Sequence, residues 1–213
     1  MREDLLRFKN DQKYLIFDYE TCNLNLGLEM NKPWQLAYIT AKGKFINERV
    51  DSWLSWPEIK VSKGAARVTG FTMQKYNKLK SDPLKALNSF EEYLYDPDYL
   101  IIGHNVLGFD VYIHNIHRSL CGKKPDYSYV DRIVDTNCIA RAIKSDIKPK
   151  EKDDFLSWQY RLLNHRVRGV KTNLKQMCLD YSIDFDATKL HNALYDIEVN
   201  FEVFKKMIWD IEI

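Results

Sequence analysis

The chain has 213 residues, of which 45% are hydrophobic and 29% are charged, the composition of a soluble globular protein. Its length suits a single domain over residues 1–213, and no apolar run approaches the ~20 residues of a membrane span. Lys and Arg number 32 against 30 Asp and Glu, and this net charge of +2 excludes a strongly basic binder of polyanions.

Three apolar segments in the first quarter of the chain predict a meander of three strands. They cover residues 14–18 (YLIFD), 34–40 (WQLAYIT) and 44–53 (KFINERVDSW), and Gly43 supplies a turn. Alternate side chains of a strand face the same way, so Asp18 and Glu20 in FDYET present two carboxylates on one side. Two anionic ligands therefore converge at the end of the first strand.

The middle of the chain is predicted to form a helix, a strand and a second helix. Asp82-Pro83 is typical of a helix start, and Asp96-Pro97 of its end. Residues 99–103 (YLIIG) predict a buried strand that leads into HNVLGFD, so Asp110 lies where this strand enters the next helix. The apolar faces of the two helices contain Leu84, Leu87, Phe90 and Leu94, and Phe109, Ile113, Ile116 and Leu120.

The last part of the chain contains the longest predicted helix. A fifth strand is expected over 130–135, followed by a helix from Asp135 through Arg141, and the polar segment 145–154 (SDIKPKEKDD) is typical of a surface loop. The long helix begins near Asn192. Its apolar stripe consists of Leu194, Ile197, Phe201, Phe204, Ile208 and Ile211.

The N-terminus and the cysteines indicate a cytoplasmic protein. The sequence MREDLLRFKNDQKYL has charges where a signal peptide would be apolar. The cysteines contain no C-x-x-C pair, which argues against a zinc site or a disulfide framework and for reduced thiols that fill the core. They are Cys22, Cys121, Cys138 and Cys178.

Four carboxylates and one histidine form the candidate site. Magnesium and manganese prefer oxygen ligands, so a few carboxylates plus substrate phosphate oxygens make a natural site for a pair of ions. Asp110 and Asp196 lie at the ends of predicted elements, where they can reach the cleft that Asp18 and Glu20 face. His191 lies just ahead of the last helix, and an imidazole can take a proton from a metal-bound water that attacks phosphorus.

Each fragment alone has a simpler structural interpretation. An Asp-x-Glu pair at a strand end is commonly a solvated edge, and an Asp in a G-F-D turn is usually a helix cap. His191 alone would be a cap or surface histidine, and Asp196 alone ordinary helix-surface polarity. Taken jointly, with every residue at the end of an element, the set favours a metal site.

Two further features have open or structural interpretations. His114 and His117 are one helical turn apart, as metal ligands can be, but a solvated helix face explains them better. The segment 158–171 (WQYRLLNHRVRGVK) mixes aromatic and basic residues, which would suit stacking and phosphate contact with a single strand. An amphipathic surface helix explains this segment equally well.

At these residues the chain resembles the DEDDh class of 3′–5′ exonucleases, the DnaQ-like proofreading and ribonuclease T type. The resemblance implies an α/β, RNase H-like fold, in which a mixed five-stranded sheet is flanked by helices on both sides. It covers most of the length. The matching motifs are FDYET, QLAYI, VTGFT, GHNVLGFD, VDTNCIAR, TNLKQMCLDYSI and HNALYDIEV.

The resemblance also implies the roles of the candidate residues. Asp18, Glu20 and Asp196 would ligate two Mg²⁺ ions directly, with Mn²⁺ as a substitute, and Asp110 would act directly or through water. His191 would be the general base. The residues expected to contact the substrate are Thr21, Phe71, His104 and Asn105.

The chain departs from the family pattern in three places. HNVLGFD has three residues between HN and FD where many relatives have two, which reshapes the loop entering Asp110. Thr69-Gly70 stands where a His-Gly pair is common. The stretch 144–171 does not align with the family, and we expect substrate preference to lie there.

We therefore expect a metal-dependent 3′–5′ exonuclease that releases nucleoside 5′-monophosphates from single-stranded nucleic acid, with DNA favoured over RNA. One alternative is a 3′–5′ exoribonuclease. Another is a proofreading or binding module associated with a polymerase or another replication partner; the absence of a docking extension beyond Ile213 favours a stand-alone enzyme.

Overall fold

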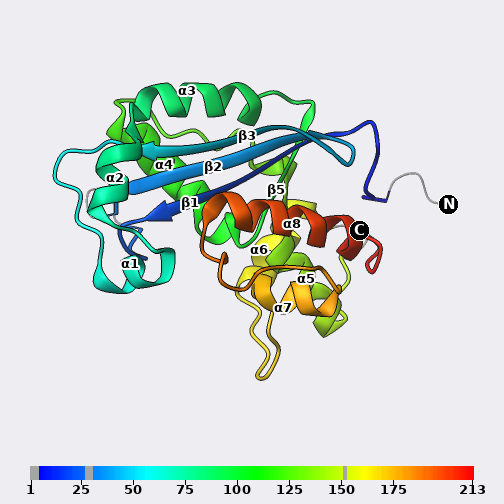
Figure 1. Cartoon of the computed structure of the whole chain (residues 1–213). Helices are drawn as coiled ribbons and strands as arrows, with labels where there is room; N and C mark the ends of the chain where they lie inside the picture. Colours follow the sequence, from blue (N-terminus) through cyan, green and yellow to red (C-terminus); the bar gives the residue numbers. More distant parts are fainter. Residues whose placement is uncertain (1–4, 27–30, 151–152) are drawn as a thin grey trace.

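The computed structural model describes residues 5–26, 31–150 and 153–213, and its centre is a six-stranded mixed sheet (Figure 1). The strands are β1 (Lys13–Thr21), β2 (Pro33–Lys42), β3 (Phe45–Leu54), β4 (Lys80–Ser81), β5 (Tyr99–Gly103) and β6 (Ile133–Asp135), in the order β4-β3-β2-β1-β5-β6. β1, β2 and β3 form the predicted antiparallel meander, and β5 and β6 run parallel to β1. The mixed sheet is confirmed, and the two-residue β4 adds a sixth strand to the five expected.

Helices cover both faces of this sheet, as expected (Figure 1). They are α1 (Lys63–Thr69), α2 (Met73–Leu79), α3 (Pro83–Leu94), α4 (Asp110–Leu120), α5 (Thr136–Ser145), α6 (Phe155–Leu163), α7 (Leu174–Asp180) and α8 (Ala193–Met207). Alternation along β1 divides the core: Leu15 and Phe17 pack with α3 and α4, whereas Tyr14 and Ile16 pack with α5, α7 and α8. Among the described helices, none is long and apolar enough to span a membrane.

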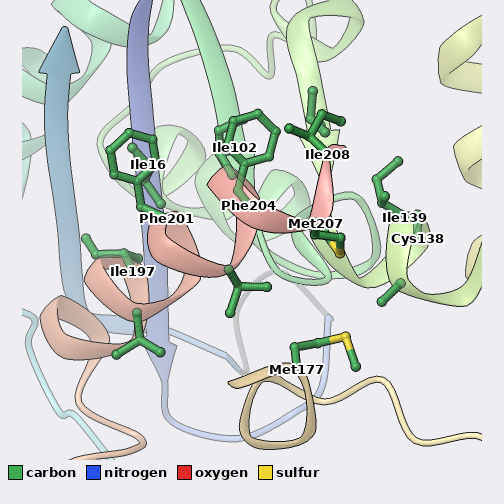
Figure 2. Packing of buried hydrophobic residues seen from close by; sticks show 14 of the residues in the cluster. Ile16, Ile102, Cys138, Ile139, Met177, Ile197, Phe201, Phe204, Met207 and Ile208 are labelled. Atoms are coloured by element: carbon green, nitrogen blue, oxygen red, sulfur yellow. The ribbon is translucent and has the colours of Figure 1, made fainter. Parts of the chain in front are cut away.

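The apolar stripe predicted for the last helix fastens α8 to the sheet. Figure 2 shows Ile197, Phe201 and Phe204 of α8 beside Ile16 of β1 and Ile102 of β5. Each side chain is at most 2% exposed, and burying one of this size stabilises the fold by roughly 1.5–3 kcal/mol. The same contacts fix the start of α8, and with it Asp196, relative to the end of β1.

The structure differs from the sequence prediction in three segments. α1 and α2 were not predicted, because α1 buries no side chain and α2 buries only Tyr76, so neither has an apolar face. The predicted strand 130–135 is half strand: Val130–Arg132 forms a 3₁₀ turn before β6. There, one guanidinium nitrogen of Arg132 donates to the carbonyls of Asp96 and Tyr99 at 2.8 and 2.6 Å.

The interpretation of His114 and His117 as a solvated helix face is wrong. Both are fully buried in α4, and hydrogen bonds satisfy both rings. His114 Nδ1 lies 2.9 Å from the Tyr129 hydroxyl, and His117 Nδ1 lies 3.2 Å from the Tyr19 hydroxyl. Burial lowers the pKa of His117 to about 3, so its ring is neutral and belongs to the core. The four cysteines are free thiols.

Candidate active site

The C-terminal end of β1 brings two of the predicted carboxylates to the side of the sheet that α8 covers. Side chains alternate along β1, so Asp18 and Glu20 follow Ile16, which packs against α8. Asp196 lies in the first turn of α8. In Figure 1 the arrowhead of β1 lies between α1 and the N-terminal end of α8.

Asp110 is held against β1 from the other helical layer. It is the first residue of α4, where a carboxylate is favoured by the helix dipole. The backbone N–H of Tyr19 donates to Asp110 Oδ1 at 2.9 Å. The residue between Asp18 and Glu20 therefore binds Asp110 directly, so the third carboxylate is fixed to the strand that carries the first two.

The turn before α8 positions His191 and Asp196 together. Asn192 caps the helix, and its side chain accepts from the backbone N–H of Tyr195. The backbone of His191 has a φ of 69°, and its N–H donates to Asp196 Oδ2 at 3.0 Å. The imidazole is exposed, and it lies at the edge of a cavity that Glu20 also lines.

The electrostatics show that the four carboxylates share one location. Burial, and then the negative charges of Asp110, Glu20 and Asp196, hold the pKa of Asp18 well above its usual range. Burial, with the charges of Asp196 and Asp110, raises the pKa of Glu20 to about 8. The pKa values of Asp110 and Asp196 are raised to about 8 and about 7, chiefly by burial. Mutually repelling acids of this kind favour a cation between them.

The donor atoms also fit a hard divalent cation. Asp196 Oδ1 is buried and has no hydrogen-bond partner among the residues that the structure describes, although its other oxygen accepts from the backbone N–H of His191. A buried carboxylate oxygen without a partner is costly, and a cation would satisfy it. Within the described residues, no group of three or more His, Cys, Asp or Glu side chains is arranged so that it could by itself hold a metal ion. Mg²⁺ is usually held by one or two carboxylates together with water and substrate phosphate oxygens, so an open set is sufficient.

A cavity of about 390 Å³ lies beside these carboxylates. Glu20, Thr21 and His191 line it, and so do residues from the N-cap to the end of α1. These α1 residues are Ser62, Gly64, Ala65, Val68 and Thr69. This wall could not be predicted from an apolar pattern, because α1 has no apolar periodicity. The VTGFT motif at the end of α1 is the feature of the sequence that marks its position. Thr21 also lines the cavity, and its contact with substrate stays a prediction.

Phe71 does not line this cavity. It is 9% exposed and packs in a small aromatic cluster, with ring centroids 5.0 Å from Trp34 and 6.3 Å from Trp53. Thr69, two residues earlier, lines the cavity instead. Phe71 therefore packs behind α1 in this structure, and its contact with the terminal nucleotide stays a prediction.

His104 and Asn105 are also structural in this fold. His104 Nδ1 lies 2.9 Å from the Thr136 hydroxyl, and burial lowers the pKa of its ring to about 4. The backbone N–H of Asn105 donates to Asp135 Oδ1 at 2.9 Å. Neither residue lines the cavity. They shape the loop that leads to Asp110, and their contact with substrate stays a prediction.

Asp135 is the residue of this region whose role the sequence analysis did not reveal. Its carboxylate is fully buried and accepts backbone N–H groups from Asn105, Leu107, Asn137 and Cys138, at 2.9 to 3.3 Å. It therefore caps α5 and at the same time holds the loop before Asp110. The sequence predicted only the cap, because the loop partners lie about 30 residues earlier in the chain.

Comparisons with known proteins identify the family and the fold of the chain. Residues 15–204 match the family model described as RNase T exonuclease. Exonuclease I, in a structure concerned with processivity, has 16% sequence identity and a TM-score of 0.69, with 92% of this chain and 40% of that chain covered. E. coli exonuclease I in complex with a dT13 oligonucleotide has 17% identity, the same coverage and a TM-score of 0.69.

A third solved structure is the zinc-bound form of the E. coli exonuclease I complex with single-stranded DNA. It has 18% identity and a TM-score of 0.68, and the match covers 92% of this chain and 40% of that chain. The chain thus spans about two fifths of the length of the solved proteins that it matches. No curated protein sequence matches it.

Proposed function

Because the chain belongs to the RNase T exonuclease family, we propose that it removes nucleoside 5′-monophosphates from the 3′ end of single-stranded DNA. The observation that carries this proposal is the convergence of Asp18, Glu20, Asp110 and Asp196 from β1, α4 and α8 beside a cavity. The raised pKa values of Asp18 and Glu20 support it, because burial and then the charges of the other carboxylates raise them.

We propose that these four carboxylates hold two Mg²⁺ ions, for which Mn²⁺ can substitute. The unpartnered Oδ1 of Asp196 supports a cation at this position, and so does the shared negative charge. Bound divalent ions lower the pKa of a water molecule and stabilise charge on the attacking and leaving oxygens. The zinc-bound form of exonuclease I shows that a protein of this fold accepts a divalent metal.

In this proposal His191 takes the proton from the attacking water. Its imidazole lies at the rim of the cavity that Glu20 and Thr21 line, and the Asn192 cap and the hydrogen bond to Asp196 fix the backbone that carries it. The water oxygen forms a bond to phosphorus as the bond to the 3′ oxygen of the preceding nucleotide breaks. The products are a nucleoside 5′-monophosphate and a strand with a new 3′ hydroxyl.

Thr21 is the residue of this chain that we propose to contact the terminal nucleotide. It is 5% exposed, and its hydroxyl donates to the carbonyl of Asn23 at 2.5 Å, so its position is fixed before substrate binds. Ala65, Val68 and Thr69 of α1 form the facing wall. A cavity with walls on two sides suits the end of a nucleic acid strand better than its interior.

DNA is the favoured substrate because solved relatives of the fold are complexes with DNA, among them the dT13 and single-stranded DNA complexes of exonuclease I. The test uses matched DNA and RNA oligonucleotides with Mg²⁺, with Mn²⁺ and with a chelator. We expect metal-dependent release of nucleoside 5′-monophosphates, faster from DNA. Faster release from RNA would mean that RNA is the preferred substrate. Release without any metal would mean that the carboxylate site does not carry the reaction.

A further inference from the structure

We propose that the connection between α6 and α7, residues 164–173, binds the phosphodiester backbone of the nucleic acid strand upstream of its 3′ end. We call this segment the basic loop. The inference rests on the proposed function for the cleft, which it extends by a second contact region on the same strand. In Figure 1 the chain between α6 and α7 projects as a long yellow loop below α5 and α7.

The distribution of charge along the chain points to this segment. Residues 155–179, which contain the basic loop, include five Lys and Arg residues and no Asp or Glu, whereas the whole chain has 32 and 30. The net positive charge of the protein, +2, therefore comes from this region. A local positive surface on a nearly neutral protein is the electrostatic footprint of a phosphate-binding surface.

The positively charged side chains of the basic loop form no ion pairs with the residues that the structure describes. Arg166, Arg168 and Lys171 are exposed, and no acidic side chain among the described residues lies within 4.0 Å of their charged groups. By contrast, Arg161 and Lys144, just outside the loop, pair with Asp153 and Asp180 at 2.5 Å. Three unpaired cations in one short segment remain available to an anionic partner.

A hollow of about 220 Å³ accompanies these cations. Arg141, His165 and Arg166 line it, together with Thr172. A guanidinium presents several N–H donors in a planar fork that matches phosphate oxygens. The hollow is therefore suited to a phosphate group, and Arg166 supplies the charge for it.

Side chains of α5 hold both ends of the basic loop, so its cations occupy a defined place. Before the loop, Arg141 donates to the carbonyl of Leu162 at 2.9 Å and also to that of Leu163. After it, Lys144 donates to the carbonyl of Lys171 at 2.5 Å, and the Thr172 hydroxyl donates to Asn137 at 2.7 Å. A loop fastened in this way does not have to be ordered in full when a strand binds.

The same helix connects the basic loop to the proposed active site. Asp135 caps α5 and holds the loop before Asp110. From Asn137 to Lys144 the helix rises roughly 10 Å, at 1.5 Å per residue. Thr172 at the end of the basic loop binds Asn137 in the first turn of α5, beside the active-site loop, so a strand that leaves the cleft can reach the basic loop after a short distance.

The contacts in this segment are with phosphate and not with bases. α6 ends at Leu163 and buries Trp158, whose side chain is 1% exposed and therefore cannot stack on a base. Phosphate contact is independent of sequence and of the sugar, and it weakens steeply with salt. The inference therefore holds for DNA and for RNA.

The test is the triple variant Arg166→Gln, Arg168→Gln and Lys171→Gln, compared with a control triple variant, Lys42→Gln, Lys85→Gln and Lys124→Gln. The control residues are exposed and lie outside the basic loop, so net charge changes equally. Binding of fluorescent oligonucleotides of increasing length is measured by anisotropy over a range of salt, with chelator present. Thermal melting confirms that both variants fold.

We expect the loop variant to bind long oligonucleotides more weakly and with a salt slope that is smaller by about 2, since each lost phosphate contact on a single strand removes about 0.7. Binding and cleavage of a dinucleotide should not change, because it occupies only the cleft. With long substrates KM should rise while kcat stays the same. The control should match the parent protein.

An unchanged salt slope in the loop variant, with cleavage intact, would overturn the inference and leave the proposed function standing. A parent protein that binds long strands through these residues but hydrolyses none would overturn the proposed function instead. An equal loss in the loop variant and the control would show a general charge effect, and that result would also overturn the inference.

Discussion

The carboxylates at the end of β1 repel one another in the absence of a cation, and single substitutions can separate this effect from catalysis. We expect Asp18→Asn and Asp196→Asn each to lower metal-dependent cleavage by about a thousandfold, the order seen when a group that stabilises transition-state charge is lost. The metal-free variants should be more stable by on the order of 1 kcal/mol, because a repelling charge has gone. Cleavage assays and chemical denaturation measure the two effects.

Glu202→Gln is the matched control for this prediction. Glu202 is an exposed acid on α8, the helix that carries Asp196, and it forms an ion pair with Lys205 of the same helix. Its substitution should change neither rate nor stability appreciably. A carboxylate variant that kept the parent rate would remove that residue from the site, and one that failed to fold would show that it is structural.

His191→Asn tests the proposed base without disturbing the turn that carries it. Asn tolerates the positive φ of this position, and the hydrogen bond to Asp196 comes from the backbone. We expect turnover to fall by about 10²–10⁴-fold while metal affinity stays close to that of the parent protein. Single-turnover kinetics and calorimetric titration with Mn²⁺ provide these values. A parent-like rate and pH profile would assign proton removal to another group.

The raised carboxyl pKa values predict how the stability of the metal-free protein depends on pH. Between about pH 6.5 and 8 the folded protein retains protons on Glu20 and Asp110, and at the lower end of this range on Asp196, that the unfolded chain has released, so stability falls as pH rises and levels off above about pH 8. Buried His104, His114 and His117 have lowered pKa values and act only at more acidic pH.

Denaturation of the metal-free protein across this pH range measures the effect. The free energy of unfolding should depend less steeply on pH in Asp196→Asn than in the parent protein. Saturating Mg²⁺ should remove most of this pH dependence, because the metal favours the ionised carboxylates. Stability that rises with pH in the metal-free protein would contradict the shared burial of these acids.

At the scale of elements, the loop between β5 and α4 depends on the cap of a different helix. Asp135→Ala removes the acceptor of four backbone N–H groups, and buried donors left without partners cost roughly 1–3 kcal/mol each, less where they find a substitute. We expect a loss of about 3 kcal/mol in the free energy of unfolding. Asp154→Ala, at the exposed cap of α6, is the control and should cost only about 1 kcal/mol. Equal losses at the two caps would show that the contacts of Asp135 to the loop contribute nothing.

Elements with a clear apolar period could be predicted from the sequence, and those without one could not. β5 occupies the predicted residues 99–103, and α8 follows the predicted Asn192 start because one stripe of side chains meets the sheet. α1 forms a wall of the cavity but buries no side chain, so no pattern marks it. Its Ser62 cap and the left-handed Gly70 that ends it are local signals too short to stand alone.

Side-chain roles were predictable only where local sequence determines them. The four carboxylates lie at the ends of elements, and they meet because the parallel and antiparallel strands place those ends together. His104 and Asn105 lie in the motif that leads to Asp110, but the residues that bind them, Thr136 and Asp135, lie about 30 residues away in sequence. Contacts of that separation follow from the fold and not from the motif.

At the scale of the whole molecule, α1 and the basic loop lie on the side of the sheet that α8 covers (Figure 1), and α1 forms a wall of the cavity that Glu20 lines. A single strand can enter at the cleft and leave toward the basic loop. This arrangement gives the strand a direction, because its end must be seated where the carboxylates converge.

The most direct test of this account is the polarity of degradation. Linear single-stranded DNA labelled at its 5′ end, and a circular strand of the same sequence, are incubated with the protein and Mg²⁺ and resolved as ladders. We predict a ladder that shortens one nucleotide at a time from the 3′ end, an intact circle, and slower degradation when a 3′-phosphate replaces the hydroxyl. Cleavage of the circle, or release of the 5′ label first, would contradict the account.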